Sequence, residues 1–138
     1  MNSNQQPANP RKILIVDDEL DVRIFVATLF ETSGYQAIMC RNGEDGLKKA
    51  QELAPDLIIL DVMMPEGGGV NMYRSLKMHP RLDPIPVIML TAVGEKSFAH
   101  YLKMLNARPE AAIRPPEAYL EKPLDEKKLL NLAAQLLS

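Results

Sequence analysis

From Arg11 to the end of the chain, short continuous apolar runs alternate with segments whose apolar residues have helical spacing. Two runs of four apolar residues end in acid: residues 13–16 lead into Asp17, and residues 57–60 lead into Asp61. Short continuous runs are typical of strands buried on both faces of a parallel sheet. Open α/β sheets bind ligands at the carboxyl ends of such strands. The pattern therefore predicts acidic side chains gathered at one edge of a sheet.

The segments between the apolar runs predict helices. Apolar residues at i, i+3, i+4, i+7 and i+8 mark one face of the first and the last helix: Val22, Phe25, Val26, Leu29 and Phe30, and Leu129, Leu132, Ala133, Leu136 and Leu137. Gly34 is the expected C-terminal cap of the first helix, and Asn42 the N-terminal cap of the second. A third helix should end before Pro80, and Phe98 to Leu105 again has helical spacing.

Three further strands are expected at 35–40, 87–90 (ending in Thr91) and 118–121, and a loop at 64–69. An irregular Pro-rich insert, residues 106–117, precedes the fifth strand. Five strand–helix units with short connections predict an α/β fold with a doubly wound, five-stranded parallel sheet. We expect one domain over residues 11–138 and a disordered N-terminal tail over residues 1–10.

Composition narrows the classes of function. The net charge is −2, so no global basic field attracts nucleic acid or an anionic membrane, and we expect neither direct DNA binding nor membrane insertion. No apolar stretch approaches the ~18 residues of a membrane span, and residues 1–10 do not resemble a signal peptide. The single cysteine, Cys40, fits a reducing cytoplasm and is expected to be a small core residue.

Polar residues with related chemistry stand at the predicted strand ends: Asp17, Asp18, Asp61, Thr91 and Lys122. Three converging carboxylates repel one another by about 4 kcal/mol per pair at ~4 Å and an effective dielectric near 20. A hard divalent cation relieves this repulsion, and oxygen ligands at an open edge suit Mg²⁺. A carboxylate can also attack phosphorus, while a lysine and a threonine can hold phosphoryl oxygens. The set predicts a Mg²⁺-dependent phosphoryl site.

Each residue alone has an ordinary interpretation. Asp17 and Asp18 could form a turn or a helix cap, Thr91 a common strand end, and Lys122 a solvated surface charge. Glu19 and Asp21 are expected to occupy the first helical turn rather than to bind metal. Only the combination, at the ends of every predicted strand except the second, favours the phosphoryl site.

The order of these motifs resembles the receiver domain of two-component response regulators. The resemblance covers nearly the whole chain from Arg11 and rests on four segments: Ile15-Val16-Asp17-Asp18-Glu19, Asp61-Val62-Met63-Met64-Pro65, Thr91-Ala92 and Tyr119-Leu120-Glu121-Lys122-Pro123. It implies a flavodoxin-like fold with sheet order 2-1-3-4-5. It also implies a stand-alone cytoplasmic signalling protein, which is no enzyme beyond catalysing its own phosphorylation and dephosphorylation.

The same resemblance assigns the metal and phosphoryl ligands. Asp61 would be the phosphoacceptor, taking a phosphoryl group from a sensor histidine kinase or a histidine phosphotransfer protein. Asp18 would bind Mg²⁺ directly and Asp17 mainly through water, and Asp61 and the backbone carbonyl of Met63 would complete the protein ligands. The downstream partner is not indicated.

The resemblance also implies a switch. Lys122 would pair with the phosphoryl group, and its peptide bond to Pro123 would be cis. Thr91 would turn its hydroxyl toward a phosphoryl oxygen, and Tyr119 would move inward, so that one local charge change biases a two-state element. Alone, Tyr119 could equally be a partly buried edge-strand aromatic.

Several features depart from the pattern of that family. Thr91 and Tyr119 are further apart than typical receivers allow, and the Pro-rich insert replaces a usual turn beside the face that receivers commonly use for dimers and partners. For this chain the resemblance is compatible with a weak or phosphorylation-dependent dimer. Gly67 and Gly68 replace a methionine and a small polar residue.

The residues two positions after Asp61 and Thr91 are apolar, Met63 and Val93. In the family these positions influence the attacking water. Since neither side chain can orient water by hydrogen bonds, we expect slow self-dephosphorylation.

Three other functions are compatible with a fold of this class. A pseudo-receiver would bind protein without using phosphate, although the acceptor, acidic pair and lysine are all present here. A Mg²⁺-dependent phosphatase would need a second aspartate where Met63 stands. A flavin-binding electron carrier would need a phosphate loop where Asp17-Asp18-Glu19 would repel phosphate.

Overall fold

The structure, a computed structural model, describes residues 9–92 and 113–138. These residues form a five-stranded sheet of order β2-β1-β3-β4-β5, in which all neighbouring strands are parallel. The strands are β1 (Lys12–Val16), β2 (Gln36–Cys40), β3 (Leu57–Asp61), β4 (Val87–Thr91) and β5 (Ala118–Glu121). The predicted flavodoxin-like sheet order is confirmed.

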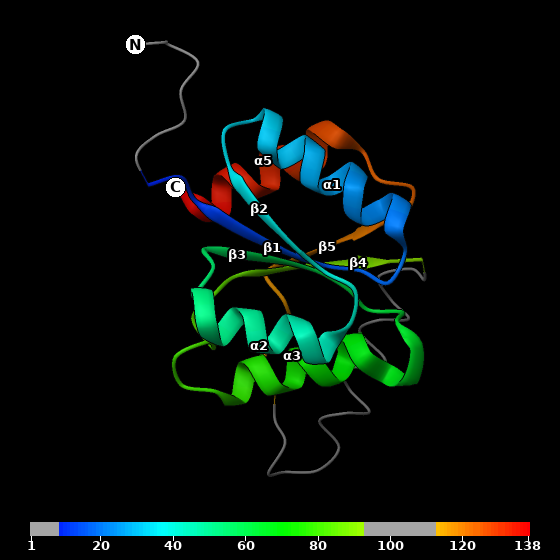
Figure 1. Cartoon of the computed structure of the whole chain (residues 1–138), viewed down its shortest axis with the longest axis vertical. Coiled ribbons are helices and arrows are strands. Elements are labelled where there is room, and N and C mark those ends of the chain that lie inside the picture. The colour runs from blue at the N-terminus through cyan, green and yellow to red at the C-terminus, as the bar shows by residue number, and fades with distance from the viewer. Residues whose placement is uncertain (1–8, 93–112) are drawn as a thin grey trace.

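Two helical layers enclose the sheet. The helices are α1 (Leu20–Thr32), α2 (Gly43–Leu53), α3 (Gly68–Met78) and α5 (Glu126–Leu137), with a short 3₁₀ helix, η1 (Pro65–Gly67). Figure 1 shows α1 and α5 on one face of the sheet and α2 and α3 on the other. The predicted helix at 98–105, Val93, the first part of the insert and most of the predicted tail lie outside the described residues.

The core consists of two apolar clusters, one on each face of the sheet. Alternate residues of a strand point to opposite faces, so β1 contributes Ile13 and Ile15 to the cluster under α1 and α5, and Leu14 and Val16 to the cluster under α2 and α3. Such double burial explains why these strands appear as continuous apolar runs in the sequence.

The predicted apolar face of the first helix is only partly buried. Val26 and Phe30 of α1 are buried, and Val22 and Leu29 pack against the same cluster. Phe25 is exposed, which differs from the expectation. Only the part of this helical face around Val26 and Phe30 packs closely on the sheet, so the buried face is narrower than the apolar spacing predicts.

Local hydrogen bonds end the helices where the sequence indicates. Asn42 accepts a hydrogen bond from the Asp45 amide at 2.7 Å and caps α2, as predicted. Gly34 follows α1 with φ of +94°, a conformation that a glycine adopts without steric cost. Cys40 is buried, as expected of a small core residue, and burial raises the pKa of its thiol.

The glycine run at 67–69 is not the loop that its composition predicted. Residues 65–67 form η1, and α3 begins at Gly68. Gly69 is buried, and a Cβ at this position would collide with the backbone carbonyl oxygen of Asp61 and with the backbone of Val62. The glycine therefore lets the first turn of α3 pack directly on the end of β3.

The end of the Pro-rich insert, residues 113–117, is anchored to the body of the domain. Ile113 is buried in the cluster under α2 and α3. The Tyr73 hydroxyl donates to the carbonyl oxygen of Arg114 at 2.6 Å, and the Arg114 guanidinium pairs with Asp83. Glu117 accepts a hydrogen bond from the Val87 amide at 2.8 Å. These contacts fix the approach to β5, and with it the segment that carries Tyr119.

Candidate functional site

The site lies where β1 and β3 end side by side. Val16 pairs with Leu60, so Asp17 and Asp61, the residues that follow, emerge next to each other. Neighbouring β2 and β4 lie on opposite outer sides of this strand pair, which makes it the switch point of the doubly wound sheet. The predicted convergence of the two acidic strand ends is therefore present in the structure.

The order of the sheet brings the other predicted residues to the same edge. Asp61 pairs in register with Leu90, the residue before Thr91. The Lys122 amide donates to the Thr91 carbonyl at 2.8 Å, which continues the ladder one step past β5. The peptide bond between Lys122 and Pro123 is cis.

Four carboxylates gather at this edge. Asp17, Asp18, Glu19 and Asp61 each offer an oxygen within 4.8 Å of the oxygens of the others. Asp17 and Asp61 are 0% and 2% exposed, whereas Asp18 and Glu19 face solvent. The cluster therefore has a buried half and an open half.

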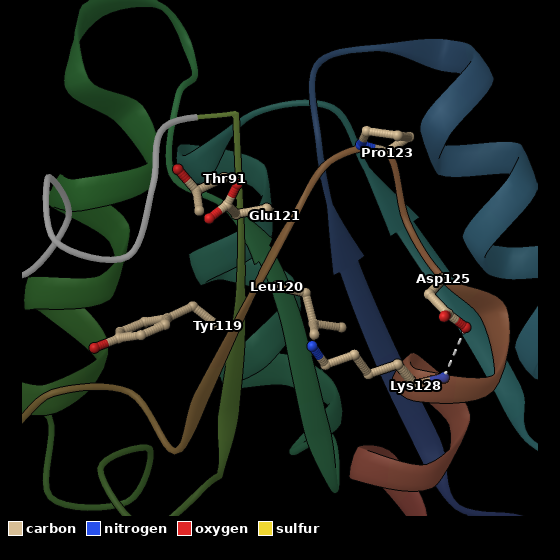
Figure 2. A pocket seen from close by; sticks show the side chains of 7 residues that line it. All are labelled: Thr91, Tyr119, Leu120, Glu121, Pro123, Asp125 and Lys128. Carbon is tan, nitrogen blue, oxygen red and sulfur yellow. Dashed lines mark hydrogen bonds between the residues drawn. The ribbon is translucent and has the colours of Figure 1, made fainter.

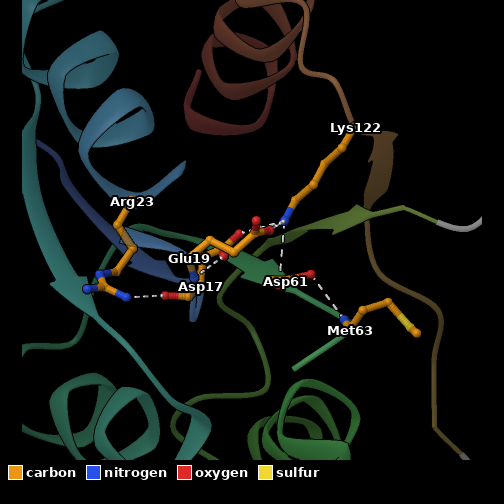
Figure 3. Close-up of polar contacts among 6 residues, drawn as sticks. All are labelled: Asp17, Glu19, Arg23, Asp61, Met63 and Lys122. Carbon is orange, nitrogen blue, oxygen red and sulfur yellow. Dashed lines mark hydrogen bonds and ion pairs between the residues drawn. The ribbon is translucent and has the colours of Figure 1, made fainter. Parts of the chain in front are cut away.

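Asp17 also has the local role that the ordinary interpretation gave it. Its Oδ1 accepts the Glu19 amide at 2.9 Å, which forms a turn before α1. The Arg23 guanidinium donates to the Asp17 backbone carbonyl at 2.8 Å, as Figure 3 shows. The turn and the hydrogen bond from Arg23 hold Asp17 in place, and its Oδ2 accepts a hydrogen bond from Lys122 in the site.

In Figure 3, Lys122 reaches the cluster from the side opposite Arg23. Its Nζ lies 3.0 Å from Asp17 Oδ2, 3.0 Å from Glu19 Oε1 and 3.5 Å from Asp61 Oδ2. Burial lowers the pKa of Lys122, but the hydrogen bonds to Glu19 and Asp17 outweigh it and raise the pKa above its ordinary value. The side chain is thus a fixed cation in the site.

Asp61 is under electrostatic strain despite this cation. Burial and the nearby Asp17 carboxylate raise the pKa of Asp61 from 3.8 to about 6, although the Met63 amide and Lys122 act in the opposite direction. The Met63 amide donates to Asp61 Oδ1 at 3.0 Å. One oxygen of Asp61 is therefore held by the backbone, and the other faces the lysine.

The donor set fits a magnesium ion. Carboxylate and backbone carbonyl oxygens are the ligands that this hard cation prefers, and the exposed Asp18 leaves the open half accessible to bound water. The excess of carboxylates over lysine also gives a divalent cation a favourable field. Asp17, Asp18 and Asp61 are the side chains suited to hold it.

Thr91 and Tyr119 border a neighbouring pocket. Thr91 is fully buried, and Tyr119 is partly buried against the cluster under α2 and α3. Both line a pocket of about 280 Å³ together with residues of β5 and the start of α5. In Figure 2 the Tyr119 hydroxyl points away from Thr91. This pocket adjoins the acidic cluster, and Asp61 is not among its lining residues.

Sequence reasoning missed two contributors to the site. Glu19 was expected only to occupy the first turn of α1, yet its carboxylate pairs with Lys122. Arg23 supports the Asp17 backbone. The acidic run 17–19 was the available signal for Glu19, but its partner lies 103 positions away in the sequence.

Among residues 9–92 and 113–138, no helix combines the length and the apolar character that crossing a membrane requires.

Fold and site together define a doubly wound α/β domain with an acidic cluster and a lysine at the carboxyl edge of its parallel sheet. A model of the response regulator receiver domain matches residues 13–134 of the chain. The chain therefore belongs to the response regulator receiver domain family. Members of this family are signalling modules rather than enzymes in the usual sense; they receive phosphoryl groups from histidine kinases and bind Mg²⁺ at an acidic pocket.

Relatives agree with this assignment. The chain is 34% identical over 123 residues to the polar-differentiation response regulator DivK of Brucella anthropi, covering 88% of this chain and 92% of DivK. It is 32% identical over 120 residues to the phosphate regulon transcriptional regulatory protein PhoB of Escherichia coli, covering 87% of this chain but only 48% of PhoB. The chain thus spans about half the length of that regulator.

Solved structures share the fold. The chemotaxis protein CheY4 of Vibrio cholerae superposes with a TM-score of 0.78 at 27% identity, covering 94% of this chain and 100% of CheY4. A putative response regulator from Chloroflexus aurantiacus superposes with a TM-score of 0.77 at 29% identity, covering 94% and 98% of the two chains.

Proposed function

We propose that Asp61 accepts a phosphoryl group from a phosphohistidine of a sensor histidine kinase or histidine phosphotransfer protein, in a reaction that requires Mg²⁺. The observation that carries this proposal is the environment of Asp61. Its carboxylate is 2% exposed, adjoins Asp17, and faces the Lys122 ammonium at 3.5 Å. A lone structural carboxylate would gain nothing from a second buried acid beside it.

In the proposed reaction an Asp61 oxygen forms a bond to phosphorus while the phosphorus–nitrogen bond of phosphohistidine breaks. The imidazole leaves with the bonding electron pair and takes up a proton. A Mg²⁺ ion held by Asp17, Asp18, Asp61 and the Met63 backbone carbonyl would neutralise charge on the phosphoryl oxygens when bound. The Met63 amide orients the carboxylate, and Lys122 donates to the transferred group.

The proposed output is a change of surface next to the site. The Thr91 hydroxyl would turn toward a phosphoryl oxygen, and Tyr119 would then move inward along the pocket that both residues line. Support comes from the position of Thr91, whose carbonyl accepts the Lys122 amide at 2.8 Å. A shift at Thr91 would therefore reach the β5 segment that carries Tyr119.

The direct test is intact mass spectrometry after incubation with Mg²⁺ and acetyl phosphate. The wild-type chain should gain the mass of one phosphoryl group, and chelation of Mg²⁺ should abolish the gain. Asp61→Asn should remain unmodified. Asp56→Asn is the matched control, because Asp56 lies at the other end of the same strand, where its carboxylate accepts the Lys12 amide at 2.8 Å.

The control variant should be modified as fast as wild type. No gain of mass in wild type, under conditions that modify another receiver, would contradict the proposal. That result would favour a pseudo-receiver that binds partners without phosphate.

We also propose that the phosphorylated state is long-lived. Met63 is half-exposed beside Asp61, and its thioether cannot orient an attacking water by a strong hydrogen bond. Val93, the other residue on which this expectation rests, lies outside the described residues. Rapid loss of the phosphoryl group from purified protein, followed by mass in the absence of any partner, would contradict this proposal.

A further inference from the structure

The lysine of the site makes its two hydrogen bonds to acids other than the proposed phosphoacceptor. Lys122 Nζ donates to Asp17 Oδ2 and Glu19 Oε1, both at 3.0 Å, and lies 3.5 Å from Asp61 Oδ2. An ammonium has three donors, so the two shorter contacts take two of them. Figure 3 shows Glu19 reaching across to the lysine above Asp61. The resting site thus directs its cation toward two other acids.

Of these two acids, Glu19 is the one that can move. Asp17 is 0% exposed, and the Glu19 amide fixes its other oxygen. The Glu19 side chain is 61% exposed and makes no capping hydrogen bond, although the residue stands at the N-cap of α1. Within the described part of the chain, its carboxylate pairs with Lys122. The Lys122 side chain is 17% exposed, so Glu19 meets it from the solvent side.

We propose that Glu19 is a positioning residue that holds the Lys122 ammonium away from Asp61 in the resting state and must release it when a phosphoryl group arrives. The inference rests on the proposed function of Asp61. A phosphoryl group brings anionic oxygens that are strong acceptors for the lysine. Glu19 competes with these oxygens for the same lysine donors. Glu19 therefore slows phosphoryl uptake, because it keeps Lys122 paired in the unmodified site.

The test compares two substitutions that break the contact in different ways. Glu19→Ala removes both the charge and the reach of the side chain. Glu19→Asp keeps the charge but is one methylene shorter, so it cannot make the 3.0 Å contact without a backbone shift. Because Glu19 is exposed and makes no cap bond, neither change should impair folding. Asp21→Ala is the matched control, since it removes an exposed acid from the same helical turn.

Two quantities should be measured at saturating Mg²⁺. The first is the rate constant for phosphorylation by acetyl phosphate, followed by intact mass. The second is the dissociation constant of beryllium trifluoride, a phosphoryl mimic that transfers nothing. Both Glu19 variants should be phosphorylated about threefold faster than wild type, and should bind the mimic about threefold more tightly, the size expected for loss of one exposed ion pair. Asp21→Ala should match wild type.

Three results would overturn the inference. If Glu19→Asp behaves like wild type while Glu19→Ala is faster, Glu19 acts through its charge and does not hold the lysine. If both variants are slower and bind Mg²⁺ more weakly in a titration, Glu19 is a metal ligand. If neither is faster than Asp21→Ala, the ion pair has no role in phosphoryl uptake. In all three cases phosphorylation of wild type would still support the function proposed for Asp61, whereas an unmodified wild type would refute both.

Discussion

Replacing Asp61 with asparagine should stabilise the metal-free protein at neutral pH. Burial and the Asp17 carboxylate raise the pKa of Asp61 from 3.8 to about 6, which means that the fold disfavours the charged form of this side chain. Asparagine removes that charge and keeps an oxygen that can accept the Met63 amide. The substitution that should abolish the proposed function should thus make the domain more stable.

The magnitude follows from the difference between the folded and ordinary pKa values. At 1.36 kcal/mol per pKa unit, the change from 3.8 to about 6 corresponds to a cost of about 3 kcal/mol at pH 7. The asparagine amide nitrogen would face the Lys122 ammonium, where Asp61 Oδ2 now lies at 3.5 Å, and this opposes part of the gain. We therefore expect a net stabilisation of about 1–3 kcal/mol.

The dependence on pH has a definite sign. Because the folded pKa of Asp61 is raised, the native state binds more protons than the unfolded state between pH 3.8 and about 6. The stability of wild type relative to Asp61→Asn should therefore rise as the pH falls through this window. Measured in the absence of metal, the advantage of the variant should shrink from pH 7 downward.

Urea unfolding in the presence of a chelator, at a series of pH values, measures this difference. Asp56→Asn serves as the control. Asp56 lies at the opposite end of β3 and is not one of the clustered carboxylates, so replacing it removes no repulsion within the cluster. A variant at Asp61 that is less stable than wild type at pH 7 would refute the reasoning. An advantage that grows toward acid pH would refute it equally.

Three further predictions concern the same region. Gly69→Ala should destabilise the domain by about 1–3 kcal/mol, the range for overpacking, because the alanine Cβ would collide with the Asp61 carbonyl oxygen. A free energy of unfolding equal to or above that of wild type would contradict this. Tyr73→Phe should cost about 1–3 kcal/mol in urea unfolding, since the Arg114 carbonyl loses its 2.6 Å donor, and an unchanged midpoint would show that water replaces it. Millimolar Mg²⁺ should raise the melting temperature of wild type more than that of Asp61→Asn, and equal shifts would place the ion elsewhere.

Those features of the site that are local in sequence could be predicted. A strand buried on both faces must be apolar throughout, so the residue at which the run stops marks the strand end, as at Asp17 and Asp61. Parallel strands then place those ends at one edge. The sheet order needed the family resemblance, since periodicity does not indicate which strands become neighbours of β1.

Features that depend on distant contacts could not be predicted. The Glu19–Lys122 pair joins residues 103 positions apart, and nothing in the local pattern of Glu19 distinguishes it from an ordinary first-turn acid. Gly69 was assigned to a loop, because glycine composition does not reveal that a helix packs on a strand end there. Phe25 fits a helical apolar face by spacing but is exposed, because burial depends on how closely α1 approaches the sheet.

The balance of charges in the site indicates what kind of ion it would bind. One lysine faces three of the four clustered carboxylates, and it lies closest to Asp17 and Glu19 rather than to Asp61. A site that served stability alone would need one acid for this lysine, and a second buried acid would only add repulsion. Burial and the Asp17 carboxylate raise the pKa of Asp61 in spite of the lysine, so the charged form of Asp61 still carries a cost in the metal-free site. Binding of a divalent cation would remove it, and the carboxylate left in its charged form would then be available as a nucleophile. The destabilised state of the metal-free site is therefore the physical reason to expect Mg²⁺ affinity and phosphoryl chemistry at the same residue.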